Sequence, residues 1–208
     1  TFDLNGNSIT NTYEFGYAIP QSSSSDGGGT IKIVNSGSQS TLSAATPLSF
    51  SNSGSNNGFV TVELSDNITF VKSSELGINL GGKTTIAYSE DVASLIGNGG
   101  FKAEKDGVAY IFGNASDAIS ADDNKTAVLL NNYTGLNSLY QNGNSGIIDL
   151  NQHTYTYTGS GTSRVVMIND DNKQLTIQNG TIASGSYIEV GLLGSGSQNV
   201  SIVFDNVS

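Results

Sequence analysis

The sequence contains no cysteine and no tryptophan, only one histidine and one arginine, and no apolar run close to membrane-spanning length. Without cysteine the chain has no disulfide framework, no nucleophilic Cys–His pair and no cysteine-based zinc site. A transmembrane helix needs about 20 consecutive apolar residues, so we expect no membrane insertion. Packing of the chain must therefore supply the stability of the fold.

Basic residues are also scarce. Lys and Arg number 8 against 18 Asp and Glu, which gives a formal net charge of −10. Proteins that bind nucleic acid carry clustered positive charge, so we expect no nucleic-acid partner. The same charge disfavours binding to anionic membrane surfaces.

What the sequence does contain is a series of short, β-branched apolar runs separated by Gly, Asn and Asp. The stretch 145–180 shows this best, because each of its runs ends at an asparagine. Short runs bounded by turn residues are typical of strands, and these leave no room for crossover helices. The runs are 147–150, 165–168 and 175–177, and the asparagines are Asn151, Asn169 and Asn179.

Parts of this stretch recur near the start of the chain. Residues 2–5 (FDLN) are echoed 146 positions later by 148–151 (IDLN), and 30–35 (TIKIVN) 144 positions later by 174–179 (QLTIQN). Strand-ending asparagines recur within the copies at spacings of 27 to 30 residues. A period of this size predicts a solenoid, with about seven coils of ~28 residues. Asparagine and glycine tolerate positive φ at tight corners, and asparagine side chains can stack in ladders between coils.

We therefore predict an all-β fold, a parallel β-helix, formed by one domain over residues 1–208. Because Thr1 is not a natural start, we expect an excised part of a longer repeat protein, with 1–145 and 146–208 as related repeat units. One or two immunoglobulin-like β-sandwiches are the alternative, because Asn-Gly pairs suit hairpins. Strands are expected at 2–4, 15–19, 30–34, 48–50, 59–64, 68–72, 84–88, 108–112, 126–130, 147–150, 155–157, 164–168, 175–177, 187–193 and 200–204.

One segment departs from the strand pattern. Residues 89–96 (SEDVASLI) predict a short helix, with Ser89 as its N-cap and two acids in its first turn. Val92, Leu95 and Ile96 fall on one helical face, and Gly97 is expected to close the helix.

The sequence offers little for catalysis. The adjacent acids Asp122-Asp123 and Asp170-Asp171 lie in turn-like settings and are expected to be solvated. His153, the only histidine, is expected to be an exposed structural residue, and Arg164 has no acid cluster beside it. We therefore expect a protein without enzymatic activity. The alternative is a polysaccharide lyase or hydrolase on a β-helical scaffold, in which two carboxylates act as acid and base.

The repeated Asp-Leu-Asn units within residues 2–10 and 146–157, together with residues 173–182, resemble the β-solenoid regions of bacterial surface adhesins. These include autotransporter passengers and wall-anchored Gram-positive adhesins. The resemblance implies a right-handed parallel β-helix displayed outside the cell, at the bacterial surface. It also implies cell adhesion through a host-cell glycan or glycoprotein. A structural stalk spacer without a ligand is a further alternative, and as an excised domain the chain is expected to be a monomer.

A ligand site is expected where the chain departs from regular coils, between residues 89 and 141. Aromatic faces suit sugar stacking and amides suit sugar hydroxyls, which selects five candidate residues there. No cofactor is expected, although three acids of the same region could hold calcium with backbone carbonyls. Tyr155 aligns with Ile9 in the echo and is expected in the core. The candidate ligand-binding residues are Tyr133, Tyr140, Asn131, Asn132 and Asn137, and the candidate calcium ligands are Asp117, Asp122 and Asp123.

Overall fold

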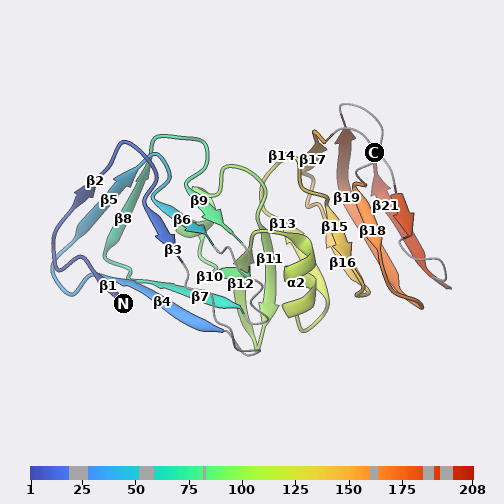
Figure 1. Cartoon of the computed structure of the whole chain (residues 1–208), viewed down its shortest axis with the longest axis horizontal. Coiled ribbons are helices and arrows are strands. Elements are labelled where there is room, and N and C mark those ends of the chain that lie inside the picture. Colours follow the sequence, from blue (N-terminus) through green and yellow to red (C-terminus); the bar gives the residue numbers. More distant parts are fainter. Residues whose placement is uncertain (19–27, 52–58, 82, 160–163, 185–189, 193–198) are drawn as a thin grey trace. The chain divides into compact units, whose positions relative to one another are not determined.

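The computed structural model shows a β-solenoid of about 6 turns (Figure 1), and among the residues that it describes strands make up 50% and two helices are present. It describes residues 1–208 except 19–27, 52–58, 82, 160–163, 185–189 and 193–198. The predicted parallel solenoid is confirmed, and the alternative of immunoglobulin-like sandwiches is wrong because nearly all strand pairs are parallel. The chain forms two compact units, residues 1–97 with 110–113, and residues 98–109 with 114–208.

Three sheets build the first unit, because each of its first three coils contributes one strand to each sheet. The sheets are β1-β4-β7-β10, β2-β5-β8 and β3-β6-β9, and all of these pairs are parallel. The strands are β1 (Phe2–Asp3), β2 (Ile9–Thr10), β3 (Gly16–Ala18), β4 (Gly29–Val34), β5 (Ser40–Ala44), β6 (Leu48–Ser51), β7 (Val60–Leu64), β8 (Ile68–Lys72), β9 (Ile78–Leu80) and β10 (Thr84–Ala87).

Side chains alternate between the interior of a coil and its surface. In β5 the buried positions are Ser40, Leu42 and Ala44, and the residues between them are half-buried. Leu48 and Phe50 of β6 are likewise fully enclosed. This period of two is what a strand with one core face requires. The sequence pattern missed β5 because serine and alanine occupy two of its three inward positions.

The predicted helix is confirmed as α1 (Glu90–Leu95). The Oγ atom of Ser89 accepts a hydrogen bond from the Val92 main-chain N–H, and Val92 and Leu95 are buried. Gly97 does not close the helix, because the C-cap residue is Ile96 in an extended conformation. A Cβ atom at Gly97 would lie 1.6 Å from the Glu75 carbonyl oxygen, so this glycine is required by close approach of two backbone segments.

The second unit repeats the three-sheet plan. Its parallel sets are β13-β16-β19-β21, β14-β17-β19 and β15-β18-β20, where β19 is long enough to serve two of them. The strands are β13 (Thr126–Leu129), β14 (Tyr133–Gly135), β15 (Tyr140–Asn142), β16 (Gly146–Asp149), β17 (Thr154–Tyr157), β18 (Val166–Ile168), β19 (Gln174–Ser184), β20 (Val190–Leu192) and β21 (Ser201–Val207). The strand predicted at 187–193 lies partly outside the described residues.

Two features of the middle of the chain depart from the predicted coils. β12 (Val108–Phe112) pairs antiparallel with β10, and β11 (Phe101–Lys105) pairs antiparallel with β13. Asp106 and Gly107, both at positive φ, form the turn that joins them. These strands and the helices leave fewer residues for coils, which accounts for about 6 turns where seven were predicted.

The second departure is a helix that the sequence pattern missed. No helix was expected before the turn-like pair Asp122-Asp123, but α2 spans Ala115–Ala121 and ends directly before this pair. Asn114 caps it by accepting a hydrogen bond from the Asp117 N–H, and Ala115, Ala118 and Ile119 are buried. These three positions follow a helical i, i+3, i+4 pattern, which is too short to stand out in the sequence.

The echoed Asp-Leu-Asn units form the same corner in both places. Asn5 and Asn151 have φ values of 49° and 50°. In each Asp-Leu-Asn sequence the aspartate Oδ1 atom accepts a hydrogen bond from the asparagine main-chain N–H, at 2.9 Å for Asp3 and 2.8 Å for Asp149. The leucine between them is buried. The repeated sequence therefore encodes a closed corner in which asparagine takes the left-handed conformation.

Candidate functional site

The candidate residue Tyr140 lies in the core of the second unit. It is fully buried, and its hydroxyl group donates to the Asn144 carbonyl oxygen at 2.7 Å. Burial raises the pKa of this hydroxyl to about 12. A ring in this position packs the core and has no open face for a sugar.

Tyr133 is half-buried and stacks on Tyr155, with ring centroids 4.3 Å apart and planes at 20°. Its hydroxyl oxygen accepts a hydrogen bond from the Asn137 main-chain N–H at 3.0 Å. The Tyr155 hydroxyl group donates to the Asn137 carbonyl oxygen at the same distance. Tyr155 is buried, as its alignment with Ile9 predicted. The two rings and the main chain of Asn137 thus form one hydrogen-bonded cluster.

The remaining candidate amides lie near this cluster. Asn132 is exposed, and its Oδ1 atom accepts a hydrogen bond from the Thr154 main-chain N–H at 2.8 Å. Its carbonyl oxygen accepts from the Gly99 N–H. Asn131 is half-buried in the same segment, and Asn137 is exposed. The structure brings Tyr133 and the three asparagines into one region and separates Tyr140 from it, and their binding of a ligand stays a prediction.

The three candidate calcium ligands already have hydrogen-bond partners. Asp122 is buried, and its Oδ1 atom accepts from the main-chain N–H groups of Asn124 and Thr126 at 2.8 and 2.9 Å. Its Oδ2 atom accepts from the Glu104 N–H. The Asp123 carboxylate accepts a hydrogen bond from the Asp106 main-chain N–H. The Asp117 carboxylate accepts one from the Asn114 side-chain amide.

These contacts give the three acids structural roles at the end of α2 and beside β11. Within the described part of the chain, no three His, Asp or Glu residues are grouped as a metal site would require. Calcium binding at these acids stays a prediction, and a metal would have to displace the backbone donors from Asp122.

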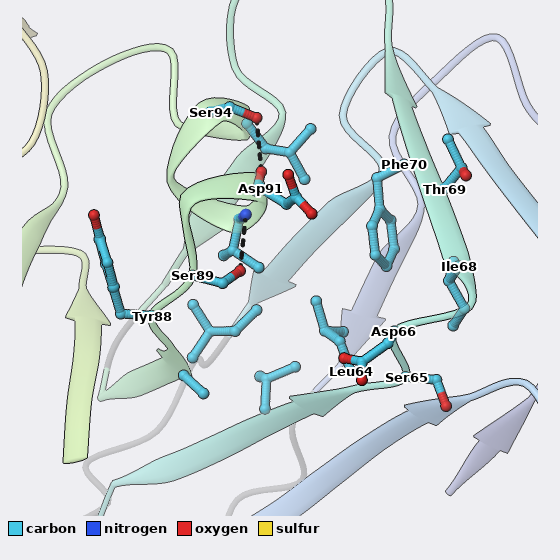
Figure 2. A pocket seen from close by; sticks show the side chains of 15 residues that line it. Leu64, Ser65, Asp66, Ile68, Thr69, Phe70, Tyr88, Ser89, Asp91 and Ser94 are labelled. Carbon is cyan, nitrogen blue, oxygen red and sulfur yellow. Dashed lines mark hydrogen bonds between the residues drawn. The ribbon is translucent and has the colours of Figure 1, made fainter.

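A pocket of about 550 Å³ lies in the first unit, between β8 and α1 (Figure 2). It exists because the fourth coil begins with β10 and continues with a helix, where the preceding coils place a strand. A helix does not fill the space of a strand stacked on β8. The pocket is lined by Val62, Leu64, Ser65, Asp66, Ile68, Thr69, Phe70, Ile86, Ala87, Tyr88, Ser89, Asp91, Val92, Ser94 and Leu95.

The lining combines an apolar interior with a polar rim. Val62, Ile86 and Val92 are buried residues of its interior. Asp66 and Asp91 are exposed and supply two carboxylates, and no lysine or arginine lines the pocket. Figure 2 shows the Asp91 side chain on the side of α1 that faces Phe70. The pocket therefore offers apolar contact, hydrogen-bond acceptors and negative charge.

Sequence reasoning located the helix but not the pocket. The interruption of the strand pattern at 89–96 was the available signal. Knowing that α1 faces β8 requires the order in which coils stack, and the sequence alone does not give that order.

Comparison of the chain with models of protein families, with curated proteins and with solved structures finds no match. Neither helix of the described residues is long and apolar enough to cross a membrane. Fold and pocket together define a β-solenoid protein in which a helix interrupts a coil beside a cavity.

Proposed function

We propose that this chain is a non-catalytic binding region of a bacterial surface adhesin, and that the pocket between β8 and α1 takes part of a host-cell glycan or glycoprotein. The observation that supports the proposal is the pocket itself, because regular coils offer only flat sheet surfaces. Its volume lies within the range of about 300–1,000 Å³ that is common for ligand sites.

The lining suits a ligand with apolar and polar parts. Phe70 is half-buried and offers an aromatic contact, and Ser65, Thr69 and Ser94 add hydroxyl groups to the lining. The carboxylates of Asp66 and Asp91 accept hydrogen bonds from hydroxyl or ammonium donors. Placement outside the cell and at the bacterial surface belongs to the same proposal.

The test is binding of the purified protein to cultured host cells and to a glycan and glycoprotein array. Asp66→Asn combined with Asp91→Asn should weaken binding by about tenfold or more, since hydrogen bonds to charged groups are worth about 1.5–3 kcal/mol each. Ala87→Trp should block binding, because Ala87 lines the pocket and a large ring there fills it.

Asp205→Asn is the matched control, because Asp205 is exposed on β21 in the other unit. It removes one carboxylate and should leave binding unchanged. If binding survives all pocket substitutions, the site is elsewhere and the assignment to this pocket fails. If the unaltered protein binds neither cells nor arrays, the spacer alternative holds.

A polysaccharide lyase or hydrolase is the second candidate, and one observation favours it. Asp66 and Asp91 both line the pocket, and a pair of carboxylates across a cleft is what glycoside hydrolysis uses. Incubation with pectin, alginate and neutral polysaccharides, with and without calcium, distinguishes the two candidates. New reducing ends or unsaturated products that disappear in Asp91→Asn would establish the enzyme and overturn the non-catalytic proposal.

A further inference from the structure

One edge of β8 is open toward the pocket. In the parallel ladder with β5, Ser40 pairs with Ile68 and Leu42 with Phe70. The Ser40 N–H donates to the Asn67 carbonyl oxygen, and the Ser73 N–H donates to the Ala44 carbonyl oxygen. Bonds of a parallel ladder use alternate residues of each strand. Odd-numbered residues of β8 therefore face β5, and the main-chain groups of Ile68 and Phe70 face the other way.

The helix α1 does not satisfy these groups. Within the described part of the chain, no residue hydrogen-bonds to the main-chain N–H or C=O of Ile68 or Phe70 on this side. At the far end of β8, the Lys72 side chain reaches the carbonyl oxygens of Ser94 and Leu95, which ties the end of α1 to the strand. The open part of the edge is thus the part that lines the pocket.

We propose that the occupant of the pocket is an extended polypeptide segment of a partner protein, which adds as a strand beside β8 and carries a lysine or arginine toward Asp66 and Asp91. The inference rests on the proposed function and names the kind of ligand that the adhesive site takes. A strand in this place completes the sheet β2-β5-β8, as a fourth coil with a strand would have done.

The hydrogen-bonding pattern selects a peptide. Ile68 and Phe70 present N–H and C=O groups in alternation along one line, and an extended backbone presents the complementary groups at the same repeat. A saccharide has hydroxyl groups and no such line of alternating donors and acceptors. Recognition by an exposed sheet edge is an established mode of peptide binding.

The side-chain environment agrees with a strand. Side chains of an added strand would alternate between the coil interior and the surface. On the interior side they would meet Leu64, Ile86 and Leu95, which are apolar. At the rim they would meet the carboxylates of Asp66 and Asp91, which have no ion-pair partner within the described residues. Alternate apolar residues with a neighbouring basic residue therefore fit this site.

The opposing explanation is that α1 only shields β8. Open edges invite aggregation, and proteins often cover them with a helix. In that case the edge needs no ligand, and peptides should not compete for it. The experiment therefore asks whether the edge-facing main-chain groups take part in binding.

The probe is a fluorescent, end-blocked hexapeptide in which valine and lysine alternate, measured by anisotropy with the intact chain. Two N-methylated versions remove the amide hydrogens at odd or at even positions. Only one set of amides can face β8, so one version should lose affinity by about tenfold or more while the other keeps it. Equal binding of both versions overturns the proposal.

Two matched substitutions test the strand itself. Phe70→Pro removes the edge-facing N–H, which an edge strand tolerates, and Phe70→Val keeps it while also removing the ring. Peptide binding should fall further in Phe70→Pro than in Phe70→Val.

A separate comparison tests the charge preference of the pocket. The double substitution Asp66→Asn with Asp91→Asn should weaken binding of the valine–lysine peptide but not of a valine–threonine peptide. A valine–glutamate peptide should bind the unaltered chain least. Equal binding of the three peptides overturns the assigned charge preference.

The two proposals fail in different ways. If cells are bound through the pocket, but the hexapeptides do not bind and a neutral oligosaccharide competes with the cells, the ligand is a glycan and only this inference is overturned. If pocket substitutions leave cell binding unchanged, the proposed function is overturned, whatever the peptides do. Peptide binding that competes with cell binding supports both.

Discussion

The Asn206 side-chain amide donates to the Oδ1 atom of Asn179 at 3.3 Å, and both residues have left-handed backbone conformations, with φ of 53° and 59°. The Asn179 amide in turn donates to Asp149 at 3.2 Å. Asn199 and Asn172 repeat this relationship at another corner, with 3.1 Å between their side chains. At these corners asparagine therefore contributes twice, through its backbone conformation and through side-chain hydrogen bonds to the adjacent coil.

Substitution of Asn179 should separate these two contributions. Asn179→Ala should lower the free energy of unfolding by about 1–2 kcal/mol for the left-handed conformation, in addition to the lost side-chain bonds. Asn179→Gly loses the same bonds without the conformational cost, so it should be the more stable variant. Urea unfolding followed by circular dichroism measures the difference. Equal stability of the two variants would show that φ at this corner does not matter.

Asp122 should be the acid that matters most for stability. Its carboxylate is buried and accepts three main-chain hydrogen bonds, so Asp122→Asn should cost on the order of 3 kcal/mol. The matched control is Asp123→Asn, which alters one exposed bond and should cost about 1 kcal/mol or less. Thermal unfolding provides the measurement, and equal losses would contradict the structural role assigned to Asp122.

The sequence predicted the solenoid because its strands are marked by β-branched residues and its corners by asparagine. The echo of Asp-Leu-Asn units even placed Tyr155 correctly in the core. The sequence pattern did not reveal β5, where serine and alanine face inward. It also did not reveal α2, whose buried face consists of Ala115, Ala118 and Ile119. Small residues fill these interiors well but do not stand out as an apolar pattern.

Alkaline pH should destabilise the fold through the buried tyrosines. Burial raises the pKa of Tyr140 to about 12, and it also raises the pKa values of Tyr17 and Tyr155. A hydroxyl whose pKa is higher in the folded state stabilises the fold fully below the unfolded pKa of about 10. That contribution is lost as pH rises from about 10 to about 12.

Tyr140→Phe tests this linkage. The variant should be less stable at neutral pH, because it lacks the bond to the Asn144 carbonyl oxygen. Between pH 10 and 12, however, its stability should fall less steeply than that of the unaltered chain, by up to about 1.4 kcal/mol per pH unit. Denaturant midpoints measured at half-unit pH steps give both slopes. Parallel slopes would show that Tyr140 ionises alike in both states.

Gly97 should tolerate no side chain. A Cβ atom there would lie 1.6 Å from the Glu75 carbonyl oxygen, so Gly97→Ala must push two backbone segments apart, at a cost of about 1–3 kcal/mol or more. Gly16→Ala is the control, because no atom lies within 4 Å of the added Cβ. It should be neutral, or stabilising by up to about 1 kcal/mol. Similar melting temperatures for both variants would contradict the close approach at Gly97.

The candidate site was harder to predict than the fold. Aromatic and amide residues of 131–140 were selected by type, but hydrogen bonds to their own backbone and stacking on Tyr155 occupy several of them. The pocket lies between α1 and β8, which are separated by β9 and β10 in the chain. No local sequence pattern indicates that these two elements lie opposite each other.

The distance along the chain between stacked partners varies from coil to coil. In the first unit, paired residues of successive coils are 31, 31 and 24 positions apart, and in the second 21, 29 and 27. Each ladder is nevertheless continuous, because the corners absorb the difference. Insertions and deletions outside the ladders can thus accumulate without moving a residue from the inside of a coil to its outside. Related chains of this kind can therefore differ in the length of individual turns. The order of inward and outward positions should be conserved between them better than the repeat length.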